Sequence, residues 1–206
     1  MIKLYYAPGS VSLASHIALE EAGAVYGAVL MDASARAAGG GRDYLAINPK
    51  GRVPALATDH GVLTETLAIL AWIAAEYPQA QLMPADSWRF AQAQAFNSYL
   101  ATTVHVAHAH RYRGYRWATE ENSFEDMRRK VPASMTDCFA LIERELLAGP
   151  WVMGDQFTVC DGYLFTTADW AEGDGVDMTL LPRVMEHRER VRARPAVRKV
   201  LAQISA

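Results

Sequence analysis

The segment Asn48-Pro49-Lys50-Gly51-Arg52-Val53-Pro54-Ala55-Leu56, followed by Leu63-Thr64-Glu65-Thr66, decides the fold of this chain. Pro54 has no backbone N–H, so it interrupts a sheet ladder where an apolar strand begins. If the Val53–Pro54 peptide bond is cis, the chain turns sharply and leaves the Val53 backbone free to pair with an extended ligand. The amides that open the next helix would then face the same opening and could bind a carboxylate. The alternative at this point is an ordinary loop with a trans proline.

The bulk composition indicates a globular protein and excludes several function classes. The 206 residues are 51% hydrophobic and 21% charged, which suits one large domain or two small ones. A formal net charge of −3 gives no general basic surface, so we do not expect nucleic acid as a partner. No stretch approaches the roughly 20 apolar residues of a membrane span, and Met1-Ile2-Lys3 does not open a secretory signal. Cys138 and Cys160 have neither metal-binding nor CxxC spacing, and we expect two buried thiols in a reducing, cytoplasmic compartment of bacterial type.

Strand and helix signals alternate in the first third of the chain. The patterns predict strands at residues 2–7, 25–30, 54–57 and 61–63, and helices from about residue 10 or 12 to 22, at 42–47 and at 64–77. The small residues at 33–41 predict a flexible loop. This order, β-α-β, then α, then β-β-α, predicts a small mixed sheet with helices on both faces.

The remainder of the chain is predicted to be all helical. Residues 78–86 contain two prolines and are typical of a linker, and helical patterns follow at about residues 88–117, 123–147, 158–171, 181–194 and 196–204. Thr158 and Asp161 have the spacing of a capping box, which would fix the start of a buried helix rather than carry chemistry. We therefore expect an α/β domain at 1–78, a linker at 79–86 and an all-α domain at 87–206.

Taken together, these segments resemble the cytosolic glutathione S-transferases, most closely the bacterial beta class. The resemblance covers nearly the whole chain and depends on motifs that follow one another in the same order, at residues 3–10, 12–17, 45–56, 63–65 and 157–165. It implies a thioredoxin-like α/β N-terminal domain, an all-α C-terminal domain, and a homodimer with clefts between the two domains. It also implies that Pro54 is cis.

The resemblance further implies a glutathione site on the first domain. The Val53 backbone would pair with the cysteinyl part of glutathione. The Glu65 carboxylate would face the γ-glutamyl ammonium, and the Thr66 amide and hydroxyl would face the γ-glutamyl carboxylate. Arg36 stands where the class often has a basic residue that reaches the glycyl carboxylate, and His105 matches a histidine that lines the cleft. Glutathione has two carboxylates and one amine, so it needs partners of both signs.

The sequence departs from the beta class where glutathione's sulfur would lie. Val11 occupies the position at which the class typically has a cysteine, so a mixed disulfide with glutathione cannot form there. The dipole of the helix could still stabilise the thiolate of glutathione by about 0.5–1 kcal/mol, and one charge-assisted hydrogen bond could add about 1.5–3 kcal/mol. Together they could lower the thiol pKa by about two units. Ser10, Ser12 and Tyr6 are the candidate catalytic hydroxyls, and Val11 would line the glutathione site. The alternatives are that the serines only cap the helix and that the Tyr6 ring packs in the core.

A histidine cluster in the helical half invites a metal interpretation. His105 and His108 share a helix face, but His110 is turned away and no carboxylate lies within that turn, so we expect no metal. Val106 follows His105 where the beta class usually has a lysine, which removes one cationic contact.

The run from Arg111 to Trp117 alternates basic and aromatic residues, a pattern also seen in single-strand nucleic-acid binding. On an acidic protein we expect it instead to line or flank the second-substrate pocket, with Tyr112 and Tyr115 contributing to that pocket. Trp170 matches a family position beside the same pocket. The alternative for Trp170 is a packed core residue.

The sequence is compatible with two functions. The first is an enzyme that binds glutathione as co-substrate, promotes its thiolate and delivers it to a small hydrophobic electrophile. The second is a glutathione-binding or regulatory protein that keeps the fold with little turnover. Val11 and Val106 favour the second function, while the retained Val53–Pro54 and Glu65–Thr66 pairs indicate glutathione affinity in either case.

Overall fold

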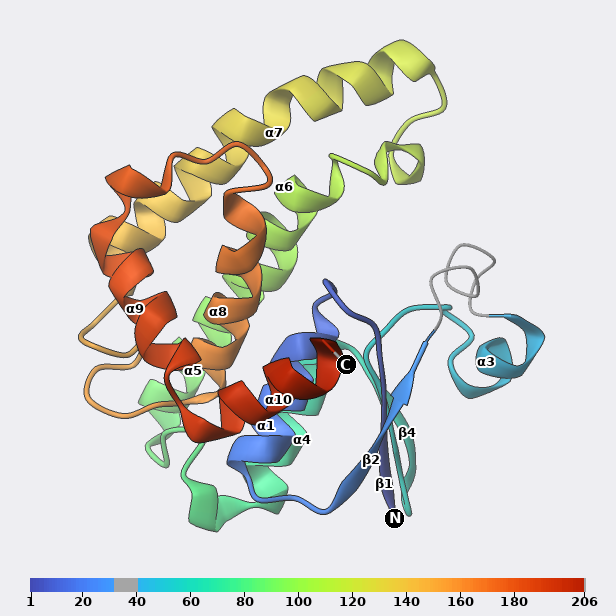
Figure 1. The fold of residues 1–206 in the computed structure, drawn as a ribbon, viewed down its shortest axis with the longest axis vertical. Coiled ribbons are helices and arrows are strands. Elements are labelled where there is room, and N and C mark those ends of the chain that lie inside the picture. Colours follow the sequence, from blue (N-terminus) through green and yellow to red (C-terminus); the bar gives the residue numbers. More distant parts are fainter. Residues whose placement is uncertain (32–40, 206) are drawn as a thin grey trace. The chain divides into compact units, whose positions relative to one another are not determined.

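The computed structural model describes residues 1–31 and 41–205 (Figure 1). Its chain divides into two compact units. The first comprises Met1–Ala85 together with Arg192–Ala206, and the second comprises Asp86–Val191. The first unit contains a small mixed sheet and the second is helical, which confirms the predicted fold class.

The first unit is organised around a four-stranded sheet. Its strands are β1 (Ile2–Tyr6), β2 (Tyr26–Leu30), β3 (Ala55–Thr58) and β4 (Gly61–Thr64), in the spatial order β2-β1-β3-β4. Strand β1 is parallel to β2 and antiparallel to β3, and β3 is antiparallel to β4. Leu4 lies opposite Leu56 in the central pair, and both side chains are fully buried. The apolar residues of these strands therefore form the core to which the helices attach.

In the described part of this unit, the α-helices are α1 (Ser12–Glu21), α3 (Gly41–Ile47), α4 (Thr66–Glu76) and α10 (Pro195–Ser205). Helix α1 packs against both α4 and α10. The guanidinium of Arg194 donates two hydrogen bonds to the Glu21 carboxylate, at 2.5 and 2.7 Å, and so fixes the start of α10 on α1. We expected residues 87–206 to form one domain, whereas the last helix packs here with the first unit; the domain boundaries themselves stay a prediction.

The start of helix α4 differs from the prediction. We expected this helix to begin at Thr64, but Thr64 is the last residue of β4 and pairs with Ala55. Glu65 then turns the chain with φ 75° and ψ 124°, and the helix begins at Thr66. Hydrophobic periodicity carries no information about a non-glycine residue with positive φ, so the pattern placed the boundary two residues too early.

The second unit contains α5 (Ser87–Tyr99), α6 (His105–Ala109), α7 (Glu121–Leu141), α8 (Val159–Ala171) and α9 (Pro182–Arg192). The single helix predicted at 88–117 is wrong, because a π-helical turn at Leu100–Val104 separates α5 from α6 and the helix ends at Ala109. A Cβ on Gly114 would lie 3.0 Å from the Phe124 ring, so glycine lets the following turn approach α7 closely. None of the described helices combines the length and apolar character that crossing a bilayer requires.

The predicted capping box at the start of α8 is confirmed. The Asp161 carboxylate is fully buried and accepts hydrogen bonds from the N–H groups of Thr158 and Val152, both at 2.7 Å. Nε2 of His187 on α9 lies 2.8 Å from the same carboxylate. Asp161 thus joins the start of α8 to the preceding loop and to α9, which is a role in folding.

Candidate functional site

The loop before β3 is held in shape by a buried asparagine. The carbonyl of Arg52 accepts hydrogen bonds from the Tyr44 hydroxyl at 2.7 Å and from the Asn48 side-chain amide at 2.6 Å. The Val53–Pro54 peptide bond that follows is cis, as the family resemblance implied. Pairing of β3 with β1 begins only at Ala55, so Val53 lies outside the sheet ladder. Val53 thus takes no part in the pairing of β3 with β1, and its pairing with an extended ligand stays a prediction.

Glu65 lies at the opening of α4, immediately before the first helical amides. Its φ of 75° is strained for a residue with a Cβ, at a typical cost of about 1–3 kcal/mol, and such strain clusters at functional sites. The Glu65 carboxylate lies 2.5 Å from Nζ of Lys50, which belongs to the loop before Val53. Thr66, the first residue of α4, is buried. Two segments that are separate in sequence are therefore joined around one carboxylate and one helix N-terminus.

The two serines before α1 form a closed network with the backbone of Ala7. The Ser10 hydroxyl donates to the Ala7 carbonyl at 2.7 Å, and the Ser12 hydroxyl lies 2.6 Å from that of Ser10. The Ser12 oxygen also accepts from the Ala7 N–H at 3.1 Å. Ser12 is fully buried, whereas Ser10 is partly exposed, so only Ser10 is accessible to a ligand.

Val11 takes the N-cap position of α1 and has no side-chain oxygen to accept from the helix amides. Tyr6 packs its ring against His16, with ring centroids 5.2 Å apart, and His16 in turn meets Tyr26 at 5.5 Å. Burial lowers the pKa of His16 below its ordinary value. The ring of Tyr6 therefore has the packing contact that we considered as the alternative to a catalytic role.

Two histidines of α6, His105 and His108, lie against Trp170. The His108 ring stacks on it at 4.3 Å, and the His105 ring lies 5.1 Å away. His110 instead packs against Trp117. Within residues 1–31 and 41–205, no group of three or more His, Cys, Asp or Glu side chains is arranged to hold a metal ion.

Asp174 is the residue of this region that sequence reasoning missed. Its buried carboxylate lies 2.6 Å from Nδ1 of His108 and 3.1 Å from Nη1 of Arg111. No carboxylate lies near the histidines in sequence, and the Asp174 carboxylate belongs to a loop more than sixty residues after His108. No local pattern could have revealed it, because only the packing of the helices brings the loop to α6.

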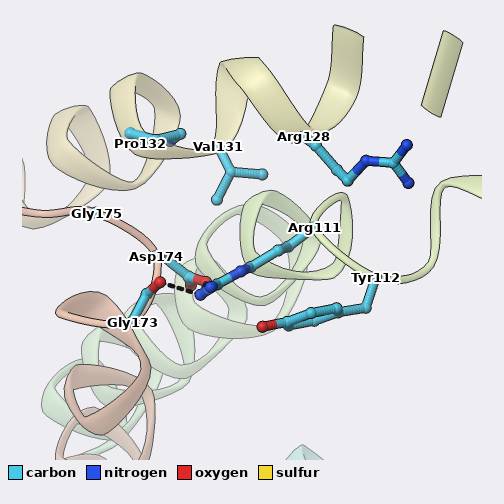
Figure 2. A pocket seen from close by; sticks show the side chains of 8 residues that line it. All are labelled: Arg111, Tyr112, Arg128, Val131, Pro132, Gly173, Asp174 and Gly175. Atoms are coloured by element: carbon cyan, nitrogen blue, oxygen red, sulfur yellow. Dashed lines mark hydrogen bonds and ion pairs between the residues drawn. The ribbon is translucent and has the colours of Figure 1, made fainter. Parts of the chain in front are cut away.

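Tyr112 lines a hollow of about 520 Å³ in the helical unit (Figure 2). The hollow is bounded by Arg111, Tyr112, Arg128, Val131, Pro132 and Gly173–Gly175. Tyr115 and Trp170, the other residues predicted for the electrophile pocket, are not part of this lining. Arg36, predicted to reach the glycyl carboxylate, lies outside the described residues.

Both cysteines are buried free thiols, as expected. Burial raises the pKa of each thiol, that of Cys160 to about 12. Neither thiol is therefore ionised at neutral pH, and neither takes the place of the cysteine that the beta class has at the position of Val11.

Comparison with known proteins agrees with these features. The N-terminal domain family of glutathione S-transferases matches residues 1–75, and a C-terminal domain family of the same proteins matches residues 109–203. A glutathione transferase homologue from Sulfitobacter, solved with bound glutathione, is 44% identical with a TM-score of 0.95, over 98% of each chain. Glutathione S-transferase GstA of Escherichia coli O157:H7 is 33% identical over 98% of each chain. Maleylacetoacetate isomerase of Pseudomonas aeruginosa is 30% identical over 76% of this chain and 74% of that protein.

Both domains of the family are thus matched in order, and GstA and the Sulfitobacter homologue each align with nearly the full length of the sequence. The cis Val53–Pro54 bond, Glu65 at the opening of α4 and the capped start of α8 lie within the matched regions. The chain belongs to the glutathione S-transferase family.

Proposed function

We propose that this protein is a glutathione transferase that conjugates glutathione to a small hydrophobic electrophile. The observation that carries the proposal is the junction of the Lys50–Val53 loop with the start of α4. There, Val53 lies outside the sheet ladder, and Glu65 and Thr66 occupy a helix N-terminus. An extended peptide with an ammonium and a carboxylate at one end would find partners of both signs at this place.

In the proposed complex, the γ-glutamyl ammonium pairs with the Glu65 carboxylate in place of Lys50. The γ-glutamyl carboxylate accepts hydrogen bonds from the Thr66 amide and hydroxyl, where the dipole of α4 favours negative charge. The cysteinyl backbone pairs with Val53. In the helical unit, His105 would contribute to the same glutathione site, and Arg36 would reach the glycyl carboxylate.

The thiolate is proposed to lie at the start of α1, beside Val11. Ser10 can turn its hydroxyl toward the sulfur without leaving a buried group unpaired. The Ser12 hydroxyl lies 3.2 Å from the Ala7 carbonyl and can donate to it when Ser10 turns away. Ser12 thus acts as a positioning residue, while the dipole of α1 and the Ser10 hydrogen bond lower the thiol pKa. Tyr6 is the weaker candidate because its ring already packs against His16.

The electrophile is proposed to bind on the helical unit, near the aromatic residues Tyr112, Tyr115 and Trp170. A thiolate held beside a bound electrophile reacts as in an intramolecular step, so proximity and the lowered thiol pKa would carry most of the rate. We further propose that the protein is a cytoplasmic homodimer of the beta class, with domains at residues 1–78 and 87–206. The mixed disulfide that a cysteine at position 11 allows is excluded here by Val11.

Titration calorimetry with glutathione, combined with conjugation of an aryl halide, tests this proposal. We expect glutathione binding and a conjugation rate above the uncatalysed reaction, both reduced in Glu65→Ala. Absence of glutathione binding would contradict the proposal.

A binding or regulatory role is the second candidate, and the closed Ser10–Ser12–Ala7 network is the observation that favours it. In that network both hydroxyl protons are already directed to protein acceptors rather than to a ligand. Tight glutathione binding without conjugation of aryl halides or epoxides would support this second role over the first.

A further inference from the structure

The hollow in the helical unit shares Tyr112 with the region proposed above for the electrophile, but its other lining residues have no part in that proposal. It is built from the segment that follows α6, from one face of α7 and from the segment that follows α8, all within Asp86–Val191. Figure 2 shows Arg111 extended between these elements, with Val131 directed toward the hollow from α7. Its volume of about 520 Å³ lies within the usual range of about 300–1,000 Å³ for small-molecule sites.

Arg111 is held in place by contacts that use one side of its guanidinium. Its Nη1 donates to the Gly173 carbonyl and to Oδ1 of Asp174. Its Cζ lies over the ring of Tyr112, 4.9 Å from the centroid. Across the described residues, the hydrogen bonds of Arg111 all use Nη1, and the side chain is 35% exposed. The edge formed by Nε and Nη2 is therefore fixed in orientation and able to donate two parallel hydrogen bonds to a carboxylate.

The anchor of this arginine is itself rigid. The Asp174 carboxylate is fully buried, and its second oxygen lies 2.6 Å from Nδ1 of His108. The ring of His108 is stacked on Trp170, with an interplanar angle of 20°. Because both oxygens of Asp174 are engaged and its surroundings are packed, Arg111 is pre-organised, which lowers the entropic cost of binding a ligand.

The rest of the lining supplies an apolar wall and a net positive charge. Val131 and Pro132 lie on α7, and Gly175 contacts Pro132 so closely that an added Cβ would lie 3.2 Å away. The lining has two guanidiniums, Arg111 and Arg128, against the single carboxylate of Asp174. Arg128 also pairs with Glu121 at 2.7 Å, but this pair is exposed and such pairs are weak.

We propose that this hollow binds a planar aromatic carboxylate. The carboxylate accepts two hydrogen bonds from the Nε–Nη2 edge of Arg111, and the ring lies against Tyr112 and the wall formed by Val131 and Pro132. The site is complete within the helical unit, so binding requires neither glutathione nor the residues at the start of α4. A neutral ligand of the same shape keeps the apolar contacts and loses the charge-assisted hydrogen bonds.

A matched pair of ligands tests the charge requirement. In NMR titrations of the full chain, 2-naphthoate should bind at least about tenfold more tightly than 2-naphthamide, since hydrogen bonds to charged groups are the strong ones. The preference should fall to about twofold or less in Arg111→Gln and be retained in Arg129→Gln, a control on α7 that lies outside the hollow and pairs with Asp126. Arg111→Lys keeps a charge beside Asp174 and should reduce the preference by about threefold or more, because the planar fork is lost.

A second matched pair tests the apolar wall without disturbing Asp174. Tyr112 and Tyr115 are 65% and 64% exposed, but only Tyr112 lines the hollow. Tyr112→Ala should weaken both ligands by about three- to tenfold, and Tyr115→Ala should leave both within about twofold of the parent protein. Equal affinity for naphthoate and naphthamide, a preference that survives Arg111→Gln, or equal effects of the two tyrosine variants would each overturn the proposal.

Discussion

Replacement of Glu65 by glutamine tests the proposed glutathione site most sharply, because it removes a charge and keeps the shape. A carboxylate–ammonium hydrogen bond contributes about 1.5–3 kcal/mol. In the free protein the same carboxylate is paired with Lys50 at 2.5 Å, and glutathione must displace that partner. Both side chains are well exposed, so the pair is worth only about 0–1 kcal/mol. The net loss on Glu65→Gln is then about 0.5–3 kcal/mol, or about two- to 150-fold in affinity.

The assay is titration calorimetry with glutathione at low ionic strength, where exposed charge pairs are least screened. Lys50→Met serves as the matched variant, because it removes the competitor and leaves Glu65 in place. We expect it to tighten glutathione binding by up to about fivefold, and to have no effect in the Glu65→Gln background. If the Glu65→Gln variant binds glutathione with an affinity within about twofold of the parent protein, the placement of the ammonium beside Glu65 is refuted. If Lys50→Met binds glutathione more weakly than the parent protein, Lys50 does not compete with the ammonium for Glu65.

Four further predictions concern the first unit. Ser12→Ala leaves the buried N–H of Ala7 without its acceptor, so it should lower the free energy of unfolding, measured in urea titrations, by about 1–3 kcal/mol. Ser10→Ala should raise the pKa of the bound glutathione thiol, measured by thiolate absorbance, by about one unit. An unchanged thiol pKa would remove Ser10 from the mechanism. Burial lowers the pKa of His16 from 6.5, so on acidification the unfolded chain takes up this proton before the folded chain does. The contribution of neutral His16 to folding stability is therefore complete above pH 6.5 and is lost as the pH falls below that value. The free energy of unfolding should therefore fall on acidification below pH 6.5, less steeply in His16→Leu, and equal slopes would contradict this. Val11→Cys should form a mixed disulfide when oxidised glutathione is added, because the new thiolate attacks one sulfur of the oxidised glutathione and releases one reduced glutathione. Mass spectrometry should show one added glutathione. The absence of this adduct would mean that position 11 does not lie beside the sulfur of bound glutathione.

The sequence predicted those parts of the fold that depend on local patterns. The alternation of apolar residues gave the four strands, and the spacing of Thr158 and Asp161 gave the start of α8. The sequence did not predict helix ends that depend on backbone geometry, because that geometry has no characteristic residue pattern. The positive φ of Glu65 delays α4, and the turn after Ala109 ends a helix whose pattern continues to Trp117.

The candidate site divides in the same way. Motif residues such as Val53 and Glu65 could be proposed from the sequence because each belongs to a short contiguous motif. The pairing of Lys50 with Glu65 and the burial of Asp174 beside His108 both join distant segments, and only packing reveals them. The internal network of Ser10 and Ser12 was likewise invisible, since a serine before a helix has the same sequence whether its hydroxyl faces a ligand or the backbone.

A crystal structure with glutathione tests the central claim most directly. We expect the γ-glutamyl carboxylate within hydrogen-bonding distance of the Thr66 amide, the ammonium beside Glu65 and the cysteinyl backbone paired with Val53. Glutathione bound at another place, with the start of α4 unchanged and Lys50 still paired with Glu65, would contradict it.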